Sequence, residues 1–187
     1  RAADMAMYEA KRAGRQQYRF FSPEMNGRAR SRLMIEESLR SAIENDDFIL
    51  VYQPQIHLES GRLRGFEALL RWQHPQHGLV PPDLFIPLAE QNGTIIPIGE
   101  WILDQTCRQL REWHDQGFNE LRMAVNLSTV QLHHAELPRV VNNLMQVYRL
   151  PLRSLELEVT ETGLMEDINT AAQHLLSLRR SGALIAI

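Results

Sequence analysis

Hydrophobic and polar residues alternate along residues 63–72, and this alternation divides the segment into two faces. With a strand's period of two, Glu67, Leu69 and Arg71 share one face, whereas the opposite face, which ends in Trp72, is almost wholly apolar. A carboxylate on a covered face is costly unless a metal ion or another cation meets it. The pattern therefore indicates either a buried charged site or an antiparallel sheet with one face in water.

Strands and helices alternate along the rest of the chain. Periodicity predicts strands at 48–54, 63–71, 122–127, 154–160 and 183–187, and helices at 82–92, 97–115, 129–148 and 169–181. Such alternation is typical of an α/β fold with a mainly parallel sheet. Only Ile56 to Arg62 join the first two strands, too few residues for a helical crossover, so this pair is expected to be antiparallel.

Each predicted strand has one apolar face and a second face that is polar near the C-terminal end of the strand. Glu67, Asn126 and Glu158 lie on such polar faces in three different strands. Polar groups at the carboxyl ends of parallel strands form the active sites of (β/α) barrels. Five strands are too few to close a barrel of this type, which typically takes about 250 residues. The pattern therefore predicts an incomplete TIM-type barrel.

Two carboxylates and an amide oxygen are hard oxygen ligands, suited to Mg²⁺ or Mn²⁺ and poorly suited to zinc. Such a cation, above all in a two-metal site, activates water and stabilises the oxygens in an in-line attack on phosphate. A second donor pair, His74 and His77, lies in a turn-rich segment and is interpreted as solvated. Glu156 shares the face of Glu158 and is expected to pair with Arg122, without a catalytic role.

Composition narrows the class of protein. The apolar fraction is 44%, the charged fraction is 23%, and the formal charge is -3, which provides no basic footprint for a nucleic-acid polymer. Cys107 is the only cysteine and lies at helical spacing with leucines, so we expect a buried thiol and a reducing compartment. No segment has the length of a membrane span. A cytoplasmic protein is expected, with a membrane anchor in an upstream part of a longer parent left open.

Five motifs in a fixed order connect the sequence to a known family. They are Tyr52-Gln53-Pro54, Gly65-Phe66-Glu67-Ala68-Leu69-Leu70-Arg71-Trp72, Phe85-Ile86-Pro87-Leu88-Ala89-Glu90, Val125-Asn126-Leu127-Ser128 and Leu155-Glu156-Leu157-Glu158-Val159-Thr160-Glu161. In these motifs the chain, from about residue 30 onward, resembles the EAL family of cyclic di-GMP phosphodiesterases. The resemblance implies a modified (β/α)8 barrel whose first strand runs against the others. It also implies hydrolysis of one phosphodiester bond of cyclic di-GMP to linear pGpG.

The resemblance further implies roles for individual residues. Glu67, Asn126 and Glu158 match the family's metal ligands. The resemblance implies that the metal is Mg²⁺ or Mn²⁺ and that the complete domain binds two ions. The residues matching substrate-binding positions are Gln53, Leu69 and Arg71, of which the arginine would contact a substrate phosphate. Glu161 matches the second glutamate of the Glu-x-Thr-Glu motif, which steadies a loop over the metals, and it is grouped with Glu67 as catalytic.

The first residues carry a second resemblance. Residues 1–22, with Ala3-Asp4-Met5-Ala6-Met7-Tyr8-Glu9-Ala10-Lys11 and Gly14-Arg15, resemble the C-terminal tail of a GGDEF diguanylate cyclase domain. There, residues matching Lys11 and Arg15 would reach GTP phosphates. The expected organisation is this helix–strand remnant of an upstream α/β domain, a connecting helix over 23–46, and the N-terminal part of an EAL domain over 47–187.

The family's paired-aspartate motif, Asp-Asp-Phe-Gly-Thr-Gly, follows a strand like residues 183–187, where this sequence stops. We therefore expect the complete parent to be the enzyme and the 187-residue piece alone to be inactive. The main alternative is a catalytically silent EAL domain that acts as a cyclic di-GMP receptor. More distant alternatives are an unrelated metal-dependent barrel enzyme and a plain interaction domain. Whether the parent forms a homodimer stays open.

Overall fold

The computed structural model describes residues 7, 18, 20 and 34–187. The expected GGDEF tail, including Lys11 and Arg15, lies outside the described residues apart from three single positions, as does the first part of the expected connecting helix. Residues 34–39 are helical and are followed by turns. The chain divides into two compact units, Arg1–Ser41 and Ala42–Ile187. The sheet and the candidate site belong to the second unit.

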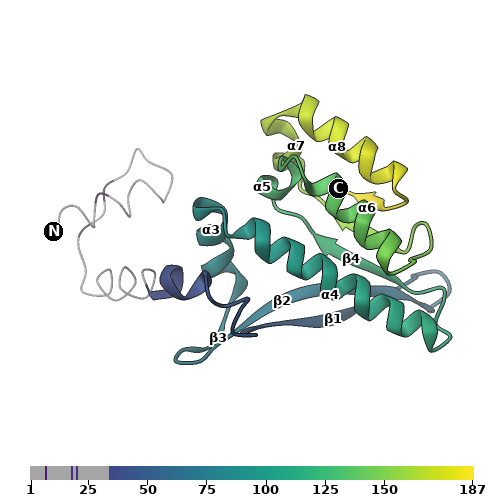
Figure 1. Ribbon diagram of the computed structural model, residues 1–187, viewed down its shortest axis with the longest axis horizontal. Coiled ribbons are helices and arrows are strands. Elements are labelled where there is room, and N and C mark those ends of the chain that lie inside the picture. The colour runs from purple at the N-terminus through teal and green to yellow at the C-terminus, as the bar shows by residue number, and fades with distance from the viewer. Residues whose placement is uncertain (1–6, 8–17, 19, 21–33) are drawn as a thin grey trace. The chain divides into compact units, whose positions relative to one another are not determined.

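A single mixed sheet organises the second unit (Figure 1). Its strands are β1 (Phe48–Ile56), β2 (Leu63–His74), β3 (Gly78–Val80), β4 (Arg122–Asn126), β5 (Leu155–Glu158) and β6 (Leu184–Ala186). Their order is β1-β2-β4-β5-β6, and β3 pairs with β2. The β1–β2 pair is antiparallel, whereas β2, β4, β5 and β6 are mutually parallel. The expected antiparallel first strand is thus confirmed, and the described sheet is open rather than closed into a barrel.

Helices connect the parallel strands. They are α3 (Pro82–Asn92), α4 (Ile95–Asp115), α5 (Thr129–Leu132), α6 (Leu137–Val147), α7 (Glu161–Glu166) and α8 (Ile168–Arg180). The helix expected over 129–148 is divided in two, because Pro138 lies in the first turn of α6, where a proline is tolerated, and cannot continue a preceding helix. Two further elements, β3 and α7, were not predicted because they are too short to show a period. None of the described helices is long and apolar enough to cross a bilayer.

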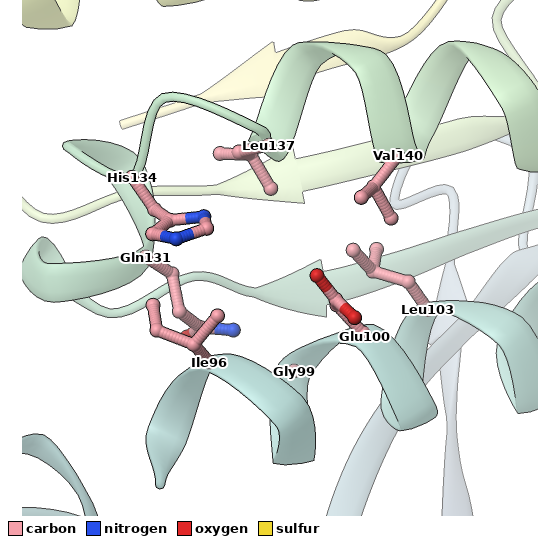
Figure 2. Close-up of a pocket in the computed structure, with 8 residues that line it drawn as sticks. All are labelled: Ile96, Gly99, Glu100, Leu103, Gln131, His134, Leu137 and Val140. Carbon is pink, nitrogen blue, oxygen red and sulfur yellow. The ribbon is translucent and has the colours of Figure 1, made fainter. Parts of the chain in front are cut away.

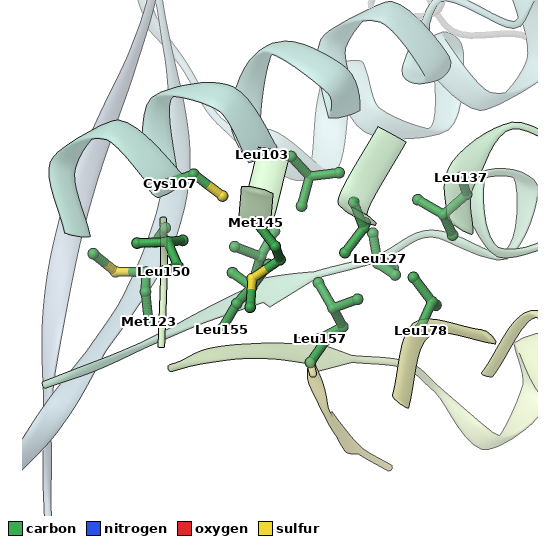
Figure 3. Close-up of a cluster of buried hydrophobic side chains, with 14 of the residues drawn as sticks. Leu103, Cys107, Met123, Leu127, Leu137, Met145, Leu150, Leu155, Leu157 and Leu178 are labelled. Carbon is green, nitrogen blue, oxygen red and sulfur yellow. The ribbon is translucent and has the colours of Figure 1, made fainter. Parts of the chain in front are cut away.

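The hydrophobic core lies between the sheet and the helices α4, α6 and α8, which cover its apolar face (Figures 1 and 3). Met123, Leu155 and Leu157 on β4 and β5 are fully buried there. Cys107 on α4 is also fully buried, and burial, with a smaller effect of the Asp104 charge, raises the pKa of its thiol to about 12. The expectation of a buried, unreactive thiol is therefore confirmed.

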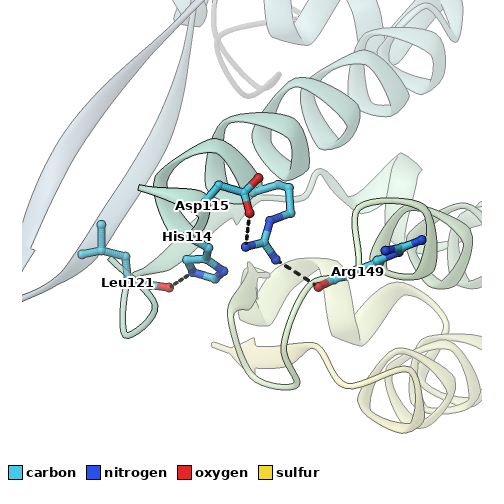
Figure 4. Close-up of polar contacts among 5 residues, drawn as sticks. His114, Asp115, Leu121 and Arg149 are labelled. Atoms are coloured by element: carbon cyan, nitrogen blue, oxygen red, sulfur yellow. Dashed lines mark hydrogen bonds and ion pairs between the residues drawn. The ribbon is translucent and has the colours of Figure 1, made fainter. Parts of the chain in front are cut away.

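Polar contacts at the end of α4 hold the loop that leads into β4 (Figure 4). The buried His114 Nε2 donates to the carbonyl oxygen of Leu121 at 2.9 Å. Arg111 forms an ion pair with Asp115 at 2.7 Å and donates to the carbonyl oxygen of Arg149 at 3.3 Å. These contacts tie α4 to the start of β4 and to the end of α6, and so position the strand that carries Asn126.

Candidate functional site

The three residues predicted as metal ligands lie together on the uncovered face of the sheet. Asn126 Nδ2 donates to Glu67 Oε1 at 2.7 Å. Asn126 on β4 lies in register beside Glu158 on β5. The carboxylate of Glu67 also acts electrostatically on Glu158. Glu67, Asn126 and Glu158 therefore share one face, as the alternation along their strands predicted.

A small residue leaves room among these side chains. Ala124, on the same face of β4, lies in register between Glu67 on β2 and Glu156 on β5. Because neighbouring strands are only about 4.8 Å apart, a larger side chain at this position would fill the space between the two carboxylates. The strand register therefore places a small residue among the carboxylates on this face of the sheet.

The electrostatics of Glu158 favour a cation at this place. Burial, and then the charges of Glu67 and Glu156, raise the pKa of the Glu158 carboxyl above its ordinary value of 4.5, while a hydrogen bond from the Gln55 side chain acts in the opposite direction. Carboxylates that repel one another in this way are relieved by a bound cation. No group of three or more His, Cys, Asp or Glu that could hold a metal occurs among the residues that the structure describes. Two carboxylates and one amide oxygen nevertheless fit Mg²⁺ or Mn²⁺.

Replacing Glu158 with glutamine is expected to raise the melting temperature of the metal-free protein at pH 7. The raised pKa means that the ionised carboxylate destabilises the folded state, and such like-charge contacts cost up to about 1 kcal/mol, or roughly 2–4 °C. The gain should vanish below the ordinary carboxyl pKa of 4.5, where Glu158 is protonated in both states. Thermal denaturation at several pH values, with the exposed Glu59→Gln as control, checks this. A lower melting temperature at pH 7 would contradict it.

Arg64, and not Arg122, is the partner of Glu156. Its Nη2 lies 2.9 Å from Glu156 Oε2. Strict alternation would put Arg64 on the apolar face, but Gln55 pairs with Gly65 and Ile56 pairs with Leu63, so Arg64 is an extra residue in a β-bulge. The bulge turns the guanidinium toward the polar face, where it neutralises the carboxylate next to Glu158. The expected pairing with Arg122 is therefore wrong.

The residues assigned to substrate lie on the same two strands. Gln53 on β1 is exposed and lies in register opposite Glu67, and Leu69 is half-buried two residues further along β2. The half-buried Arg71 donates from Nη1 to the carbonyl oxygen of Leu70 at 2.8 Å. Gln53, Leu69 and Arg71 thus border the Glu67 side of the site, and the guanidinium of Arg71 is held by its own strand.

Glu161 is the first residue of α7, the helix that follows β5. The preceding residue, Thr160, caps this helix by accepting a hydrogen bond from the backbone nitrogen of Gly163 at 3.3 Å. The Glu161 side chain is exposed. No hydrogen bond or ion pair within the described part of the chain joins it to Glu67, Asn126 or Glu158. Its expected role toward a loop stays a prediction.

Comparison with known proteins identifies the family. The model of the EAL domain matches residues 36–187. The chain belongs to the EAL family. Among curated relatives, it is 45% identical over 185 residues to the bifunctional diguanylate cyclase/cyclic di-GMP phosphodiesterase MucR of Pseudomonas aeruginosa, covering 99% of this chain and 27% of that protein. It is 40% identical to the cyclic di-GMP phosphodiesterase PdeR of Escherichia coli, covering 98% and 27%. The chain thus spans about a quarter of the length of these relatives.

Solved EAL structures have the same fold. The PaMucR phosphodiesterase in complex with c-di-GMP superposes with a TM-score of 0.79 at 44% identity, over 82% of this chain and 62% of that chain. The FimX EAL domain from Pseudomonas aeruginosa bound to c-di-GMP superposes with a TM-score of 0.72 at 26% identity, over 81% and 60%. The α/β fold with its mixed sheet is therefore that of EAL domains, and relatives in this family are named as cyclic di-GMP phosphodiesterases.

Sequence reasoning missed two polar residues of this EAL site, Gln55 and Arg64. Gln55 lies on the same face of β1 as Gln53, but its contact with Glu158 joins two strands that are not neighbours in the sheet. Arg64 reaches the site only through the bulge. The sequence offered one indication of Gln55, because it is a polar residue on the polar face of its strand. Nothing in the sequence indicated the bulge at Arg64.

His74 also differs from its prediction. The interpretation as a solvated loop histidine is wrong, because His74 is the last residue of β2 and is 4% exposed. Its ring lies 4.5 Å from the ring of His77, and its Nδ1 accepts a hydrogen bond from the backbone nitrogen of Gln76 at 3.1 Å. One ring nitrogen is thus used within the turn itself, which gives His74 a structural role.

A pocket between α4, α5 and α6 lies on the helical side and is separate from the site (Figure 2). Its volume of about 10 Å³ has room for one water at most. The buried Gln131 reaches over Gly99 of α4, its Oε1 accepts from the backbone nitrogen of Ser128 at 2.9 Å, and Ser128 Oγ accepts from the backbone nitrogen of Gln131. This reciprocal capping box begins two residues after Asn126, so the pocket is a packing feature that supports the site.

The Gly99→Ala variant is expected to be less stable than the native protein by on the order of 1 kcal/mol. A Cβ at this position would lie 1.7 Å from Gln131 Nε2. Displacing Gln131 costs the capping box, roughly 1–2 kcal/mol, which exceeds the 0.5–1 kcal/mol or so that alanine returns in a helix. Thermal denaturation of Gly99→Ala, Gln131→Ala and the double variant checks this. The double variant should be no less stable than Gln131→Ala alone, and additive losses would contradict the explanation.

Proposed function

We propose that the protein carrying this chain hydrolyses one phosphodiester bond of cyclic di-GMP to linear pGpG, in a reaction that depends on Mg²⁺ or Mn²⁺. The observation that carries the proposal is the convergence of Glu67, Asn126 and Glu158 on one face of an EAL-family sheet. Relatives at 40% identity and above are named as cyclic di-GMP phosphodiesterases, which supports the substrate and the reaction.

In this proposal each residue has a defined task. Glu67, Asn126 and Glu158 would hold the metal through oxygen atoms, which requires the Asn126 amide to turn its Oδ1 toward the ion in place of the Nδ2 that now faces Glu67. A bound divalent cation supplies an activated water and stabilises charge on the phosphate. Arg71 would bind a phosphate oxygen after giving up its bond to the Leu70 carbonyl, and Gln53 would contact the substrate from the exposed side of β1.

The polar residues around Glu158 would keep that ligand in place. Gln55 would contact the carboxylate of Glu158, and the ion pair of Arg64 with Glu156 would keep the neighbouring carboxylate from competing for the ion. Ligands that are held by such neighbouring groups bind a metal more tightly.

The first 22 residues support a second part of the proposal, that a GGDEF domain precedes the EAL domain. The similarity to the bifunctional diguanylate cyclase/phosphodiesterase MucR extends over 99% of this chain and therefore includes this segment. In the proposed tandem protein, Lys11 and Arg15 belong to the cyclase tail, and the domain that follows is the phosphodiesterase.

Incubation of the purified full-length protein with cyclic di-GMP and Mn²⁺, followed by chromatography, tests the proposed reaction. We expect pGpG to accumulate, and we expect EDTA to stop the reaction and added Mn²⁺ or Mg²⁺ to restore it. Isothermal titration calorimetry with cyclic di-GMP distinguishes the enzyme from the alternative, a receptor, because a receptor binds cyclic di-GMP without turnover. Tight binding with no product would contradict the proposed hydrolysis and support the receptor function.

A further inference from the structure

Acidic residues are absent from two long stretches of the EAL unit, which include α6 and α8. No Asp or Glu occurs between residues 137 and 155 or between 168 and 187, although the chain has 23 acidic residues in 187. An even distribution would place about five acidic residues in stretches of this combined length. The same stretches contain five arginines, Arg139, Arg149, Arg153, Arg179 and Arg180, all of them exposed. These stretches are therefore basic in a chain of net charge -3.

Helices α6 and α8, which lie side by side in Figure 1, enclose a groove. We call it the basic groove; it is lined by Arg139 and Asn142 from α6 and by Ser177, Arg180 and Ser181 from α8 and its end. Its volume of about 450 Å³ has room for several side chains, far more than a single ion needs. Within the described part of the chain, Glu136 is the carboxylate that forms an ion pair here, and it contacts Arg139.

Local contacts hold the arginines only weakly. Arg179 and Arg180 lie in the last turn of α8, where cations are favourable. Arg139 lies in the first turn of α6, where a cation opposes the helix dipole, and it is ion-paired with Glu136, the N-cap residue of that helix. An exposed pair of this kind contributes little to the free energy of folding, so a carboxylate of a partner can replace Glu136 beside Arg139.

Apolar side chains border the basic end of the groove. Leu176, four residues before Arg180 on α8, is 54% exposed, and Leu152 is 73% exposed. Leu152 packs against Gly182, because a Cβ added to this glycine would lie 2.4 Å from the Cδ2 of Leu152. The backbone N–H of Arg153 donates to the carbonyl oxygen of Gly182 at 2.7 Å. Exposed leucines beside exposed guanidinium groups form a surface that an amphipathic partner can match.

We propose that the basic groove binds an acidic amphipathic helix of a partner protein. Carboxylates of such a helix would pair with Arg139 and Arg180 in the groove, and its leucine-type side chains would cover Leu152 and Leu176. A single-stranded nucleic acid would find no aromatic side chain in the groove lining on which its bases could stack. Charge complementarity and shape together favour an acidic helix.

Binding of a designed probe to the full-length protein tests this proposal. The probe is a fluorescent helical peptide with Glu and Leu at three- and four-residue spacing, and its control has Gln in place of Glu. We expect the Glu peptide to bind and the Gln peptide not to bind, and binding to weaken with salt. The double variant Arg139→Glu/Arg180→Glu should lower affinity at least about tenfold. The double variant Arg40→Glu/Arg62→Glu, with the same change of charge at exposed positions elsewhere, should not.

Three outcomes would overturn the proposal. The first is equal affinity of the peptide for the groove variant and the native protein. The second is preferential binding of phosphatidylserine vesicles or single-stranded DNA, lost in the groove variant. The third is self-association of the peptide-free protein that the groove variant abolishes, which would identify a second copy as the occupant. A cooperative thermal transition of the groove variant at the native melting temperature verifies that the variant is folded, and this control does not depend on the proposed hydrolysis.

Discussion

Replacing Glu67 with alanine is expected to lower cyclic di-GMP hydrolysis by roughly a thousandfold or more. The change removes one of two carboxylates proposed to hold the metal, and a bound cation contributes several kcal/mol of charge stabilisation, at about 1.4 kcal/mol per tenfold in rate. It also removes the acceptor of the Asn126 hydrogen bond, so a second proposed ligand loses its orientation. The measurement is steady-state turnover in Mn²⁺, together with Mn²⁺ affinity by calorimetry.

The fold should survive this substitution. Asn126 is exposed, so its amide group can bond to water when Glu67 is removed, and no buried polar group is left unpaired. Glu59→Ala, in the exposed turn between β1 and β2, is the matched control and should keep full activity. Near-native turnover by a folded Glu67→Ala protein would refute the metal-site assignment, whereas loss of turnover accompanied by loss of the cooperative thermal transition would show only misfolding.

Gly65→Ala should destabilise the EAL unit more than any surface substitution, by about 3 kcal/mol or more. A Cβ on Gly65 would lie 2.2 Å from the backbone carbonyl oxygen of Arg122 and 2.8 Å from its carbonyl carbon. These are backbone atoms of the neighbouring strand β4, which pairs with β2 at this point, so relief of the clash requires the strands to separate. Such strain exceeds the usual 1–3 kcal/mol of an overpacked core.

Thermal and urea denaturation measure this effect. The control is Gly78→Ala, at which an added Cβ meets nothing within 4 Å but the positive φ of 66° is strained. That strain costs roughly 1–2 kcal/mol, so the Gly65 variant should lose distinctly more stability. Equal losses in the two variants would show that the β2–β4 pairing yields easily at this position and would contradict the prediction.

Much of the candidate site could be predicted, because in a strand the spacing of two residues along the sequence determines whether their side chains point to the same face of the sheet. The alternation of β2, β4 and β5 put Glu67, Asn126 and Glu158 on one face, and parallel pairing put their strands side by side. The partner of Glu156 could not be predicted, because the bulge at Arg64 interrupts the period of two at one residue. A bulge depends on the pairing of two strands rather than on the residues of one.

The helices show the same difference: long helices with a periodic pattern could be predicted, whereas short helices that depend on local contacts could not. The long amphipathic helix α4 and the helix α3 were predicted within two residues, because many turns contribute to the pattern. The capped six-residue α7 was not, because its existence depends on the Thr160 cap and on packing of Gly163 close to Thr129 of α5. Such short elements depend on tertiary contacts, which a single sequence does not contain.

The β1–β2 hairpin also has a consequence for the order of folding. Its two strands are joined only by residues 57–62, so their pairing closes a short loop, and hairpins of this kind form in about 1–10 μs. The parallel pairing of β2 with β4 must instead await the intervening chain with α3 and α4, and such distant contacts are slow to form. The hairpin that carries Gln53, Glu67 and Arg71 is therefore expected to be a template on which the remaining strands are added.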